Sequence, residues 1–548
     1  MRLSVFTGIL GLSGLLLFVG CRTDSGSLST KSVFRYNESA GITSLDPAFA
    51  SDQANIWAVN QLFNGLVQLN DALHVVPCIA KSWNVSQDGL SYRFILRDDV
   101  WFHDSEVFPG GKGRRVTAYD FVFSFNRLRA PENASPGAWI FDQVSSEGET
   151  PGFIAINDTI LNIRLRETFP PFLGLLTMQY CSVVPQEAAD KYGKDFRKHP
   201  VGTGPFRFKL WKEGVKLVMT RNDRYFEKEH GHPLPCLDAV TITFIADKQA
   251  AFLEFIKGNL DFISGLHPTY KDELLNNSGE LNSKYSSRIN LEKCPYLNTE
   301  YLGILINNKD SQANPLNNKL VRQAINHGFD RNKMILYMRN GIGIPGTKGF
   351  VPAGFPLFKQ ELVNGYDYNP ARSRQLLEEA GYPGGSGLPP ITLTTNASYL
   401  DLCKYIQSQL NDIGFEIRID VTPPATLREM VACSKVTFFR GSWIADYPDA
   451  ENYLSLFYSE NFSPAGPNTT HYSNPEFDRL YRSAISERND SVRGSIYVEM
   501  DNLVMEEAPV IVLYYDQVLR FTQKNISMIG CNPLNLLQLK RVKKSRLN

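Results

Sequence analysis

A strand–helix–strand unit in the last third of the chain constrains the fold most strongly. Residues 391–395 are rich in β-branched side chains, and an apolar stripe at helical spacing runs from Leu402 to Ile413. Residues 415–421 then alternate apolar and charged side chains, which is the pattern of a half-buried strand. Loops this short between strand, helix and strand imply parallel pairing with a right-handed crossover. The sequence therefore predicts a mixed α/β protein.

Signals at helix ends predict further elements along the chain. Thr117 followed by Asp120 three residues later is a capping box that opens a helix after a period-2 strand at 92–97. The other predicted helices begin with a cap or end at a glycine. They cover 321–327, 330–341, 369–381 and 474–485.

The composition limits the classes to which the protein can belong. The 548 residues are enough for two to four domains, and 43% hydrophobic with 21% charged residues is typical of a soluble globular protein. Lys+Arg and Asp+Glu both number 57, so the charge balance does not favour a nucleic acid partner. We interpret the one basic cluster, at 540–546, as a solvated tail.

The first residues have the pattern of an export signal. Arg2 precedes an apolar run from Leu3 to Val19, and Gly20 stands before Cys21. We expect residues 1–20 to be a signal peptide. The sequence around Cys21 resembles the lipobox of bacterial lipoproteins, so we expect Cys21 to be lipidated and 21–32 to form a flexible tether. The alternative is an ordinary cleaved signal with an incidental cysteine.

Seven cysteines remain besides Cys21, and none of them forms a C-x-x-C pair. Export permits disulfide bonds. An odd number leaves at least one thiol free if the others pair, and the spacing does not give the connectivity.

Catalytic motifs are missing from the sequence. It has no G-x-S-x-G, H-E-x-x-H or P-loop pattern. The best metal candidate is His230-Gly-His232 with Cys236 and Asp238, but its setting rich in glycine and proline favours a polar loop. We therefore predict no enzyme, no cofactor and no metal site.

The segment 439–453 carries the strongest binding signal. Asp446 lies between Trp443 and Tyr447, with Arg440 six residues upstream. A carboxylate framed by aromatic rings is costly to desolvate unless a cation meets it, and a guanidinium group suits a carboxylate. A ligand that carries both an amine and a carboxylate, such as a peptide, would use both residues. The alternative is that Asp446 and Arg440 pair with each other or with solvent.

Motifs spread over nearly the whole chain resemble the oligopeptide- and dipeptide-binding lipoproteins of ABC importers, bacterial solute-binding protein family 5. No single motif is specific, but their order and spacing together carry the resemblance. They are Leu45-Asp-Pro47, Asn64-Gly65-Leu66, the blocks 80–92, 102–104 and 117–125, and the blocks 200–206, 322–325, 376–382 and 472–478.

The resemblance implies an α/β fold of a definite kind, a two-lobed periplasmic-binding-protein clamshell with a third, inserted domain. Hinge crossings are expected near 300 and 507. The implied division is 33–75 with 186–300 and 508–548 as lobe I, 76–185 as the inserted domain, and 301–507 as lobe II.

The resemblance also implies roles at the site. Asp446, in the family's W-x-x-D-Y context with Trp443, is expected to bind a peptide α-amino group, and Arg440 a peptide carboxylate. The backbone at Gly441 and Ser442, and across the cleft at Ser51 and Asp52, is expected to bind the peptide as an added strand, and Tyr301 to line the cleft. A disulfide found in some members is excluded because its positions are Asn298 and Ile444.

The implied function is that of a lipid-anchored receptor on the periplasmic or extracytoplasmic face, which captures peptides and delivers them to an ABC permease. It is expected to act as a monomer, with peptides, the permease and the membrane as its partners. Alternatives keep the fold but change the ligand to a murein peptide, sugar, signalling peptide, nickel chelate or haem, the last two using His103 or His230 and His232. A surface adhesin and an exported hydrolase are alternatives from other classes.

Overall fold

The computed structural model describes residues 31–145, 152–267, 269–306 and 314–546. The predicted signal peptide, the lipidation site Cys21 and nearly all of the tether lie outside these ranges. Within them, no helix has both the length and the apolar character needed to cross a membrane.

A mixed sheet runs through the fold, and within the described residues it has eleven strands. Ten of them follow one another in the order β17 (Ile417–Val421), β16 (Ile391–Thr395), β18 (Phe438–Ile444), β14 (Ile289–Ile304), β19 (Val510–Gln523), β13 (Phe262–Ser264), β1 (Val33–Asn37), β12 (Ala239–Thr243), β9 (Lys216–Arg221) and β8 (Phe206–Lys212), with β15 (Ile344–Pro345) also on β19. The predicted mixed α/β class is confirmed.

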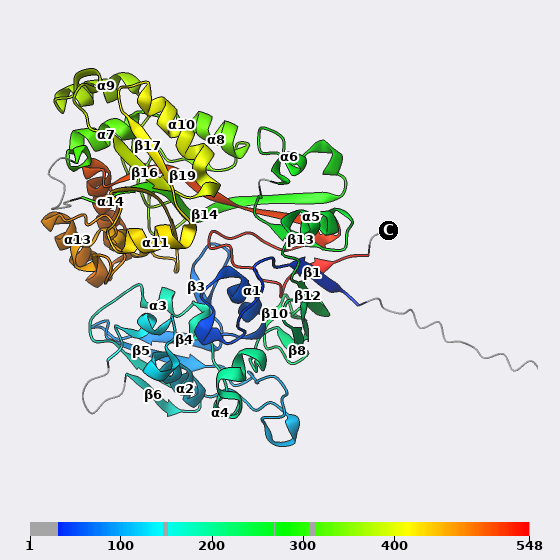
Figure 1. The fold of residues 1–548 in the computed structure, drawn as a ribbon. Coiled ribbons are helices and arrows are strands. Elements are labelled where there is room, and N and C mark those ends of the chain that lie inside the picture. Colours follow the sequence, from blue (N-terminus) through cyan, green and yellow to red (C-terminus); the bar gives the residue numbers. More distant parts are fainter. Residues whose placement is uncertain (1–30, 146–151, 268, 307–313, 547–548) are drawn as a thin grey trace, which may run out of the picture. The chain divides into compact units, whose positions relative to one another are not determined.

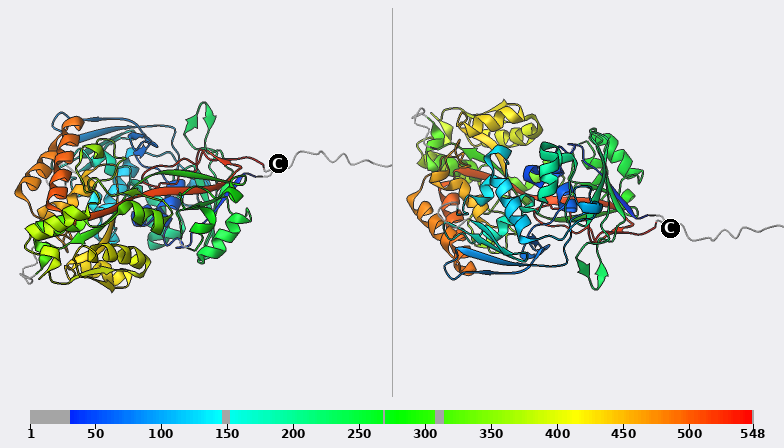
Figure 2. Two further views of the ribbon diagram at one scale, coloured as in Figure 1. Left: turned by 90° about the horizontal axis from the view of Figure 1, so that it is seen from above. Right: turned by 90° about the horizontal axis from the view of Figure 1, so that it is seen from below.

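The two longest strands, β14 and β19, connect the two halves of this sheet. They pair antiparallel along most of their length, and the register shifts between Pro295 and Thr299 and again between Glu300 and Tyr301. Figure 1 shows them running side by side from the part that holds α7–α10 to the part that holds α5 and α6, and Figure 2 shows the same course for β19 from above. The predicted crossing near residue 300 lies at these register shifts. The bounds of the lobes stay a prediction.

The half of the sheet with β16–β18 is covered on both faces. Leu302 and Ile304 of β14 pack against one group of helices, while Tyr301, the residue before Leu302, packs against the other group. The first group is α7 (Lys319–His327), α8 (Arg331–Arg339), α9 (Pro370–Glu379) and α10 (Leu400–Asn411), and the second is α12 (Glu451–Leu454), α13 (Pro475–Ser486) and α14 (Asp490–Glu507). β16 and β17 are parallel and joined through α10, so the predicted strand–helix–strand unit is confirmed.

A separate four-stranded sheet lies within residues 80–164. Its order is β4 (Ala80–Val85), β5 (Ser91–Leu96), β7 (Ile160–Arg164) and β6 (Phe153–Asn157). Helix α2 (Ala118–Arg129) packs on it, and the predicted capping box is present, with the Thr117 amide donating to Asp120 at 2.8 Å. These elements fall inside the range predicted for the inserted domain.

The remaining helices and short strands complete the description. The helices are α1 (Gln53–Leu62), α3 (Phe172–Leu175), α4 (Gln186–Tyr192), α5 (Lys248–Ile256), α6 (Lys271–Leu274) and α11 (Pro424–Ala432). The strand pairs are β2 (Val67–Leu69) with β3 (Val75–Pro77), β10 (Lys228–Glu229) with β11 (His232–Pro233), and β20 (Ile526–Ser527) with β21 (Lys543–Lys544).

The basic cluster near the C-terminus is not a solvated tail, so that interpretation was wrong. Lys540 is buried and its ammonium lies 2.5 Å from a carboxylate oxygen of Glu227. Lys544 lies 2.8 Å from Asp261 in the same way. These lysines are ion-paired to the body of the protein, because each meets a carboxylate that would otherwise be desolvated without a partner.

One disulfide bond joins Cys294 on β14 to Cys531 in the C-terminal segment. Asn298 and Ile444 face each other in the register of β14 and β18, where the excluded disulfide of some relatives would lie. The cysteines without a disulfide in the described residues are Cys78, Cys181, Cys236, Cys403 and Cys433.

Candidate functional site

Asp446 stands two residues beyond the end of β18, and its side chain is open to solvent. Many protein atoms nevertheless surround the carboxyl, because it lines a cavity instead of an outer surface. Burial raises the pKa of Asp446, and a hydrogen bond from the Asn452 amide, at 3.4 Å, opposes that rise in part. A cation placed beside this carboxylate would stabilise its charged form.

The cavity next to Asp446 has a volume of about 390 Å³. Ser51 and Asp52, which the sequence predicted on the opposite side of a cleft, line the same cavity, so the structure brings these three residues together. Asp52 is the N-cap of α1 and accepts from the Asn55 backbone amide at 3.0 Å. The other lining residues are Gln53, Ile56, Trp57, Asn60, Leu69, Thr177, Met178, Gln179, Tyr180, Tyr296, Ile444, Ala445, Leu534 and Leu536.

Trp443 does not line this cavity but helps to position Asp446 through Asn452. The Trp443 indole N–H donates to Asn452 Oδ1 at 3.1 Å, and the Asp446 backbone amide donates to the same oxygen at 3.2 Å. The Tyr453 hydroxyl also donates to the Trp443 carbonyl at 2.8 Å. Asn452 is buried, so these bonds are shielded from water and hold the Asp446 loop in one conformation.

Gly441 and Tyr301 face each other in the pairing of β18 with β14. A Cβ at position 441 would lie 2.7 Å from the Tyr301 ring, so only glycine fits there. The ring itself is buried and contacts Phe350 edge-on, with 5.1 Å between centroids. Neither residue lines the cavity; Tyr301 belongs to the core beneath the sheet.

One edge of β18 is available for a further strand. β16 pairs with β18 only at Thr394 and Phe439, so in the described residues no strand pairs with that edge from Arg440 to Ile444. Ser442 and Ile444 are exposed there. Unpaired backbone N–H and C=O groups on such an edge can bind an extended peptide.

Arg440 points away from the face that carries Trp443, because the two positions are an odd number of residues apart on a strand. Its guanidinium is ion-paired with the buried carboxylate of Glu300 on β14, and it lies over the Tyr399 ring at 3.3 Å from the centroid. Burial lowers the pKa of Arg440 to about 10. The structure thus gives Arg440 a partner within the protein, and its contact with a ligand carboxylate stays a prediction.

A group of buried acids and tyrosines follows Asp446. Tyr447 and Tyr481 both donate hydroxyl hydrogen bonds to Glu451. Burial raises the pKa of Glu451 to about 7. This group does not line the cavity, but Tyr447 is the residue next to Asp446 in the chain.

The histidines considered for metal or haem lie elsewhere. His103 is buried, its Nε2 lies 3.0 Å from the Gly204 carbonyl, and burial lowers its pKa to about 4. His230 and His232 are on the small β10–β11 hairpin. In the described part of the chain, no three His, Cys, Asp or Glu side chains lie close enough together to hold a metal ion.

Several residues at the cavity were missed by the sequence analysis. Asn452 is six residues beyond Asp446 and could have been suspected from its place in the same segment. Trp57, Tyr180, Tyr296 and Leu534 come from four distant segments and carry no local motif, so only the fold shows that they meet.

Known proteins resemble this chain over most of its length. The model of bacterial extracellular solute-binding proteins, family 5 Middle, matches residues 74–464. The glutathione-binding protein GsiB of Salmonella typhimurium is 25% identical over 494 residues, which cover 89% of this chain and 90% of GsiB.

Solved structures of low identity share the fold. The periplasmic binding protein DppA of Helicobacter pylori in complex with the peptide STSA has a TM-score of 0.75 at 23% identity, covering 94% of this chain and 99% of DppA. HbpA2 of Haemophilus parasuis has a TM-score of 0.80 at 22% identity, covering 94% and 100% of the two chains. The family model spans most of the chain, and we conclude that this protein belongs to the bacterial extracellular solute-binding proteins of family 5.

Proposed function

We propose that this protein captures a peptide in the cavity at Asp446 and delivers it to the permease of an ABC importer. The observation that carries the proposal is the cavity itself, which brings the Asp446 carboxylate opposite Ser51 and Asp52. The protein acts by binding, without a chemical step of its own. Two relatives with named ligands support a peptide: GsiB is a glutathione-binding protein, and DppA was solved with the peptide STSA.

Asp446 supplies the charge that recognises the peptide amine. Its carboxylate is open to the cavity, and burial alone raises its pKa, so the empty site keeps an ionic group that is incompletely solvated. An α-ammonium group restores a partner of opposite charge and donates hydrogen bonds to the carboxylate oxygens.

The unpaired edge of β18 supplies recognition that does not depend on sequence. A peptide that pairs with the backbone between Arg440 and Ile444 adds a strand to the sheet, beside the exposed Ser442. Tyr301 and Gly441 support this edge from below, and Trp443 fixes the loop that follows it.

The anchor and location belong to the same proposal. Cleavage before Cys21 and lipidation of its thiol would hold the protein on the extracytoplasmic face of a bacterial membrane, where it acts as a monomer of two lobes and an inserted domain. The intact mass of protein purified from membranes tests this, since an unmodified residue 21 would contradict it.

The amine role is tested with the variant Asp446→Asn and two matched peptides, one with a free amine and one N-acetylated. Removing one partner of a desolvated charge pair costs about 2–5 kcal/mol, so we expect the free-amine peptide to lose at least about thirtyfold in affinity by calorimetry. The N-acetylated peptide is expected to lose much less.

The control for this experiment is Asp401→Asn, which changes an exposed aspartate on α10 that does not line the cavity. It is expected to bind both peptides as the wild type does. An equal loss of both peptides in Asp446→Asn would rule out amine capture by this residue.

A further inference from the structure

A second, smaller cavity lies directly behind the peptide cavity. Its volume is about 90 Å³, and it is built around the C-terminal half of α1, strand β2 and the segment 536–540. The residues that line both cavities are Asn60, Leu69, Thr177, Met178, Gln179 and Leu536. These shared residues place the smaller cavity next to the cavity at Asp446.

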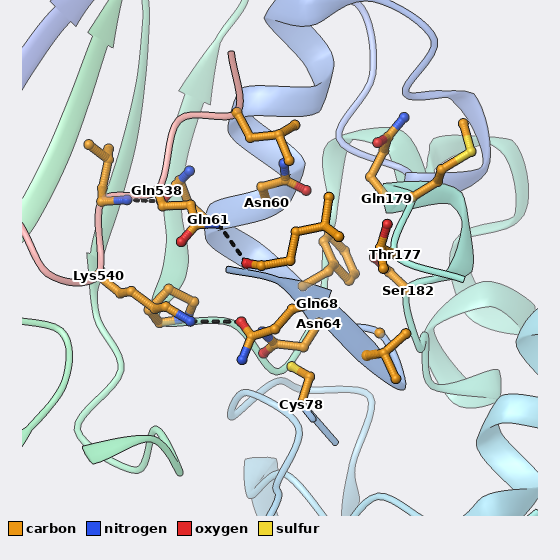
Figure 3. A pocket seen from close by; sticks show the side chains of 18 of the residues that line it. Asn60, Gln61, Asn64, Gln68, Cys78, Thr177, Gln179, Ser182, Gln538 and Lys540 are labelled. Atoms are coloured by element: carbon orange, nitrogen blue, oxygen red, sulfur yellow. Dashed lines mark hydrogen bonds between the residues drawn. The ribbon is translucent and has the colours of Figure 1, made fainter. Parts of the chain in front are cut away.

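Carboxamide side chains form part of the lining of the small cavity, and Figure 3 labels them. They are Asn60, Gln61, Asn64, Gln68, Gln179 and Gln538. The Gln61 amide already has partners within the protein, because it donates to the Trp57 and Leu537 carbonyls at 2.9 and 2.8 Å. The Asn60 side chain, in contrast, makes no hydrogen bond with any described residue, although it is half-buried where the two cavities meet.

Lys540 is the one charged residue of this lining, and its charge is already balanced. The ammonium lies 2.5 Å from Glu227 and donates to Gln68 Oε1 at 2.8 Å, while the Gln68 amide donates to Glu227 at 2.7 Å. Figure 3 shows Lys540 and Gln68 joined in this way. A ligand carboxylate or ammonium that entered would find no free counter-charge and would lose its hydration.

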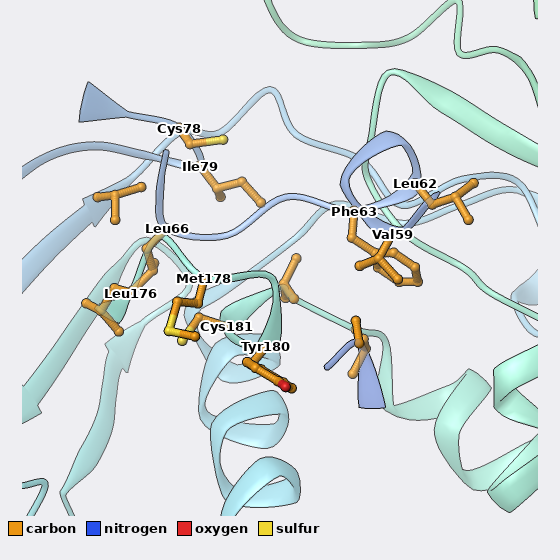
Figure 4. Close-up of a cluster of buried hydrophobic side chains, with 14 of the residues drawn as sticks. Val59, Leu62, Phe63, Leu66, Cys78, Ile79, Leu176, Met178, Tyr180 and Cys181 are labelled. Atoms are coloured by element: carbon orange, nitrogen blue, oxygen red, sulfur yellow. The ribbon is translucent and has the colours of Figure 1, made fainter. Parts of the chain in front are cut away.

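The remaining walls are fixed by the hydrophobic core. Phe63, Cys78 and Met178 line the cavity and belong to the core cluster shown in Figure 4. Close packing of such a cluster resists expansion, so the volume of the cavity is set. The space is less than a quarter of the cavity at Asp446 in volume, so it suits a short side chain better than a large aromatic one.

We propose that this cavity is a specificity pocket that selects an uncharged, amide-bearing side chain of the bound peptide. The proposal rests on the proposed peptide-binding function. A glutamine or asparagine side chain both donates and accepts, so it can pair with Asn60 and can donate to the Oε1 atoms of Gln179 and Gln538. The NH2 groups of those two glutamines already donate to the Ala50 and Leu69 carbonyls, at 2.8 and 3.5 Å. An apolar side chain of the same length would leave those groups without partners, and a charged one would be desolvated without a counter-ion.

The experiment uses the full-length mature protein and alanine tripeptides in which each position in turn is glutamine, glutamate or methionine. These three side chains have nearly the same length and differ in charge and hydrogen bonding. We expect glutamine, at one position, to bind at least about tenfold more tightly by calorimetry than both glutamate and methionine. Asn60→Leu is expected to reduce that ratio to less than threefold, whereas Gln375→Leu, at an exposed position on α9, retains it.

The possible results distinguish a failure of the proposed pocket from a failure of the proposed peptide-binding function. Tripeptides that bind with a glutamine preference below tenfold at every position would overturn the pocket and leave peptide binding intact. A full preference that persists in Asn60→Leu would overturn the assignment to this cavity. If no tripeptide binds, the proposed function fails and the pocket fails with it.

Discussion

Asn452 fixes the position of the Asp446 carboxylate through hydrogen bonds. One carboxamide accepts hydrogen bonds from the Trp443 indole and the Asp446 backbone and donates to the Asp446 carboxylate. A buried amide that serves three groups from one short segment fixes their relative positions, because moving any of them leaves a buried polar atom unpaired. The amine site proposed at Asp446 therefore depends on Asn452 as well.

Glu451 makes the stability of this segment depend on pH. Its carboxyl is fully buried between two tyrosine hydroxyls, and its pKa in the folded state is raised to about 7. The folded state therefore binds a proton that the unfolded state, with a pKa near 4.3, has already released. The contribution to stability is complete below about pH 4.3 and is lost as the pH rises through 7.

The variant Glu451→Gln isolates this effect, because glutamine does not titrate. We expect the free energy of unfolding of the variant, relative to the wild type, to increase from pH 4.5 to pH 8 by up to about 3 kcal/mol. Urea denaturation at a series of pH values measures the difference, with the exposed Glu361→Gln as the control. A difference that is flat or falls with pH would contradict the buried protonated carboxyl.

At the scale of elements, the disulfide bond ties the long strand β14 to the segment that follows β20. Cys294 and Cys531 are 237 residues apart in sequence, so the bond closes a long loop in the unfolded chain. Restricting a loop of that length raises the free energy of the unfolded state by up to about 5 kcal/mol in the chain-entropy model.

We expect the double variant Cys294→Ser/Cys531→Ser to lose up to that amount in the free energy of unfolding. Urea denaturation measures it, and a reductant is expected to bring the wild type down to the level of the variant. Cys433→Ser, which changes an exposed cysteine that forms no disulfide, is the control. A wild type that is as stable reduced as oxidised would show that the bond contributes nothing.

The sequence predicted elements whose signals are local. The β16–α10–β17 unit and the capping box of α2 follow from residue periodicity and from paired cap residues, and both are present. The partner of Arg440 is not local: Glu300 is 140 residues away and meets it only because β14 and β18 pair. The odd spacing of Arg440 and Trp443 did contain the information that their side chains lie on opposite faces.

The same distinction explains the pairing that the sequence could not show. In the sequence, Lys540 looks like part of a basic tail. In the fold it lies beside Glu227, which is 313 residues away along the chain. The cysteine pairing was equally hidden, since Cys294 and Cys531 meet only after the C-terminal segment has packed beside β14. Contacts between distant segments carry no periodicity, so sequence patterns do not show them.

At the scale of the whole of residues 32–548, the segment 439–453 also contacts residues that are distant in the sequence. Tyr447 lies 6.3 Å from Trp139, centroid to centroid, and Pro448 lies 3.4 Å from where a Cβ of residue 174 would be. Trp139 and Gly174 both belong to the range predicted for the inserted domain. Because Tyr447 follows Asp446 directly, the proposed capture of an amine and the contact with Trp139 and Gly174 involve the same loop. A ligand that favours this arrangement shifts the population toward it.

Trp139→Ala tests whether this contact contributes to binding. Trp139 is 39% exposed, so its removal is expected to leave the fold intact. Loss of an aromatic contact worth about 0.5–1.5 kcal/mol makes the arrangement with this contact less populated and is expected to weaken binding about two- to tenfold. The loss is expected to be the same for peptides of different sequence, because Trp139 does not line the cavity.

Trp101→Ala, at 41% exposure, is the matched control, since Trp101 contacts Arg224 instead. Equal affinities in the wild type and Trp139→Ala would show that the contact does not stabilise the bound state.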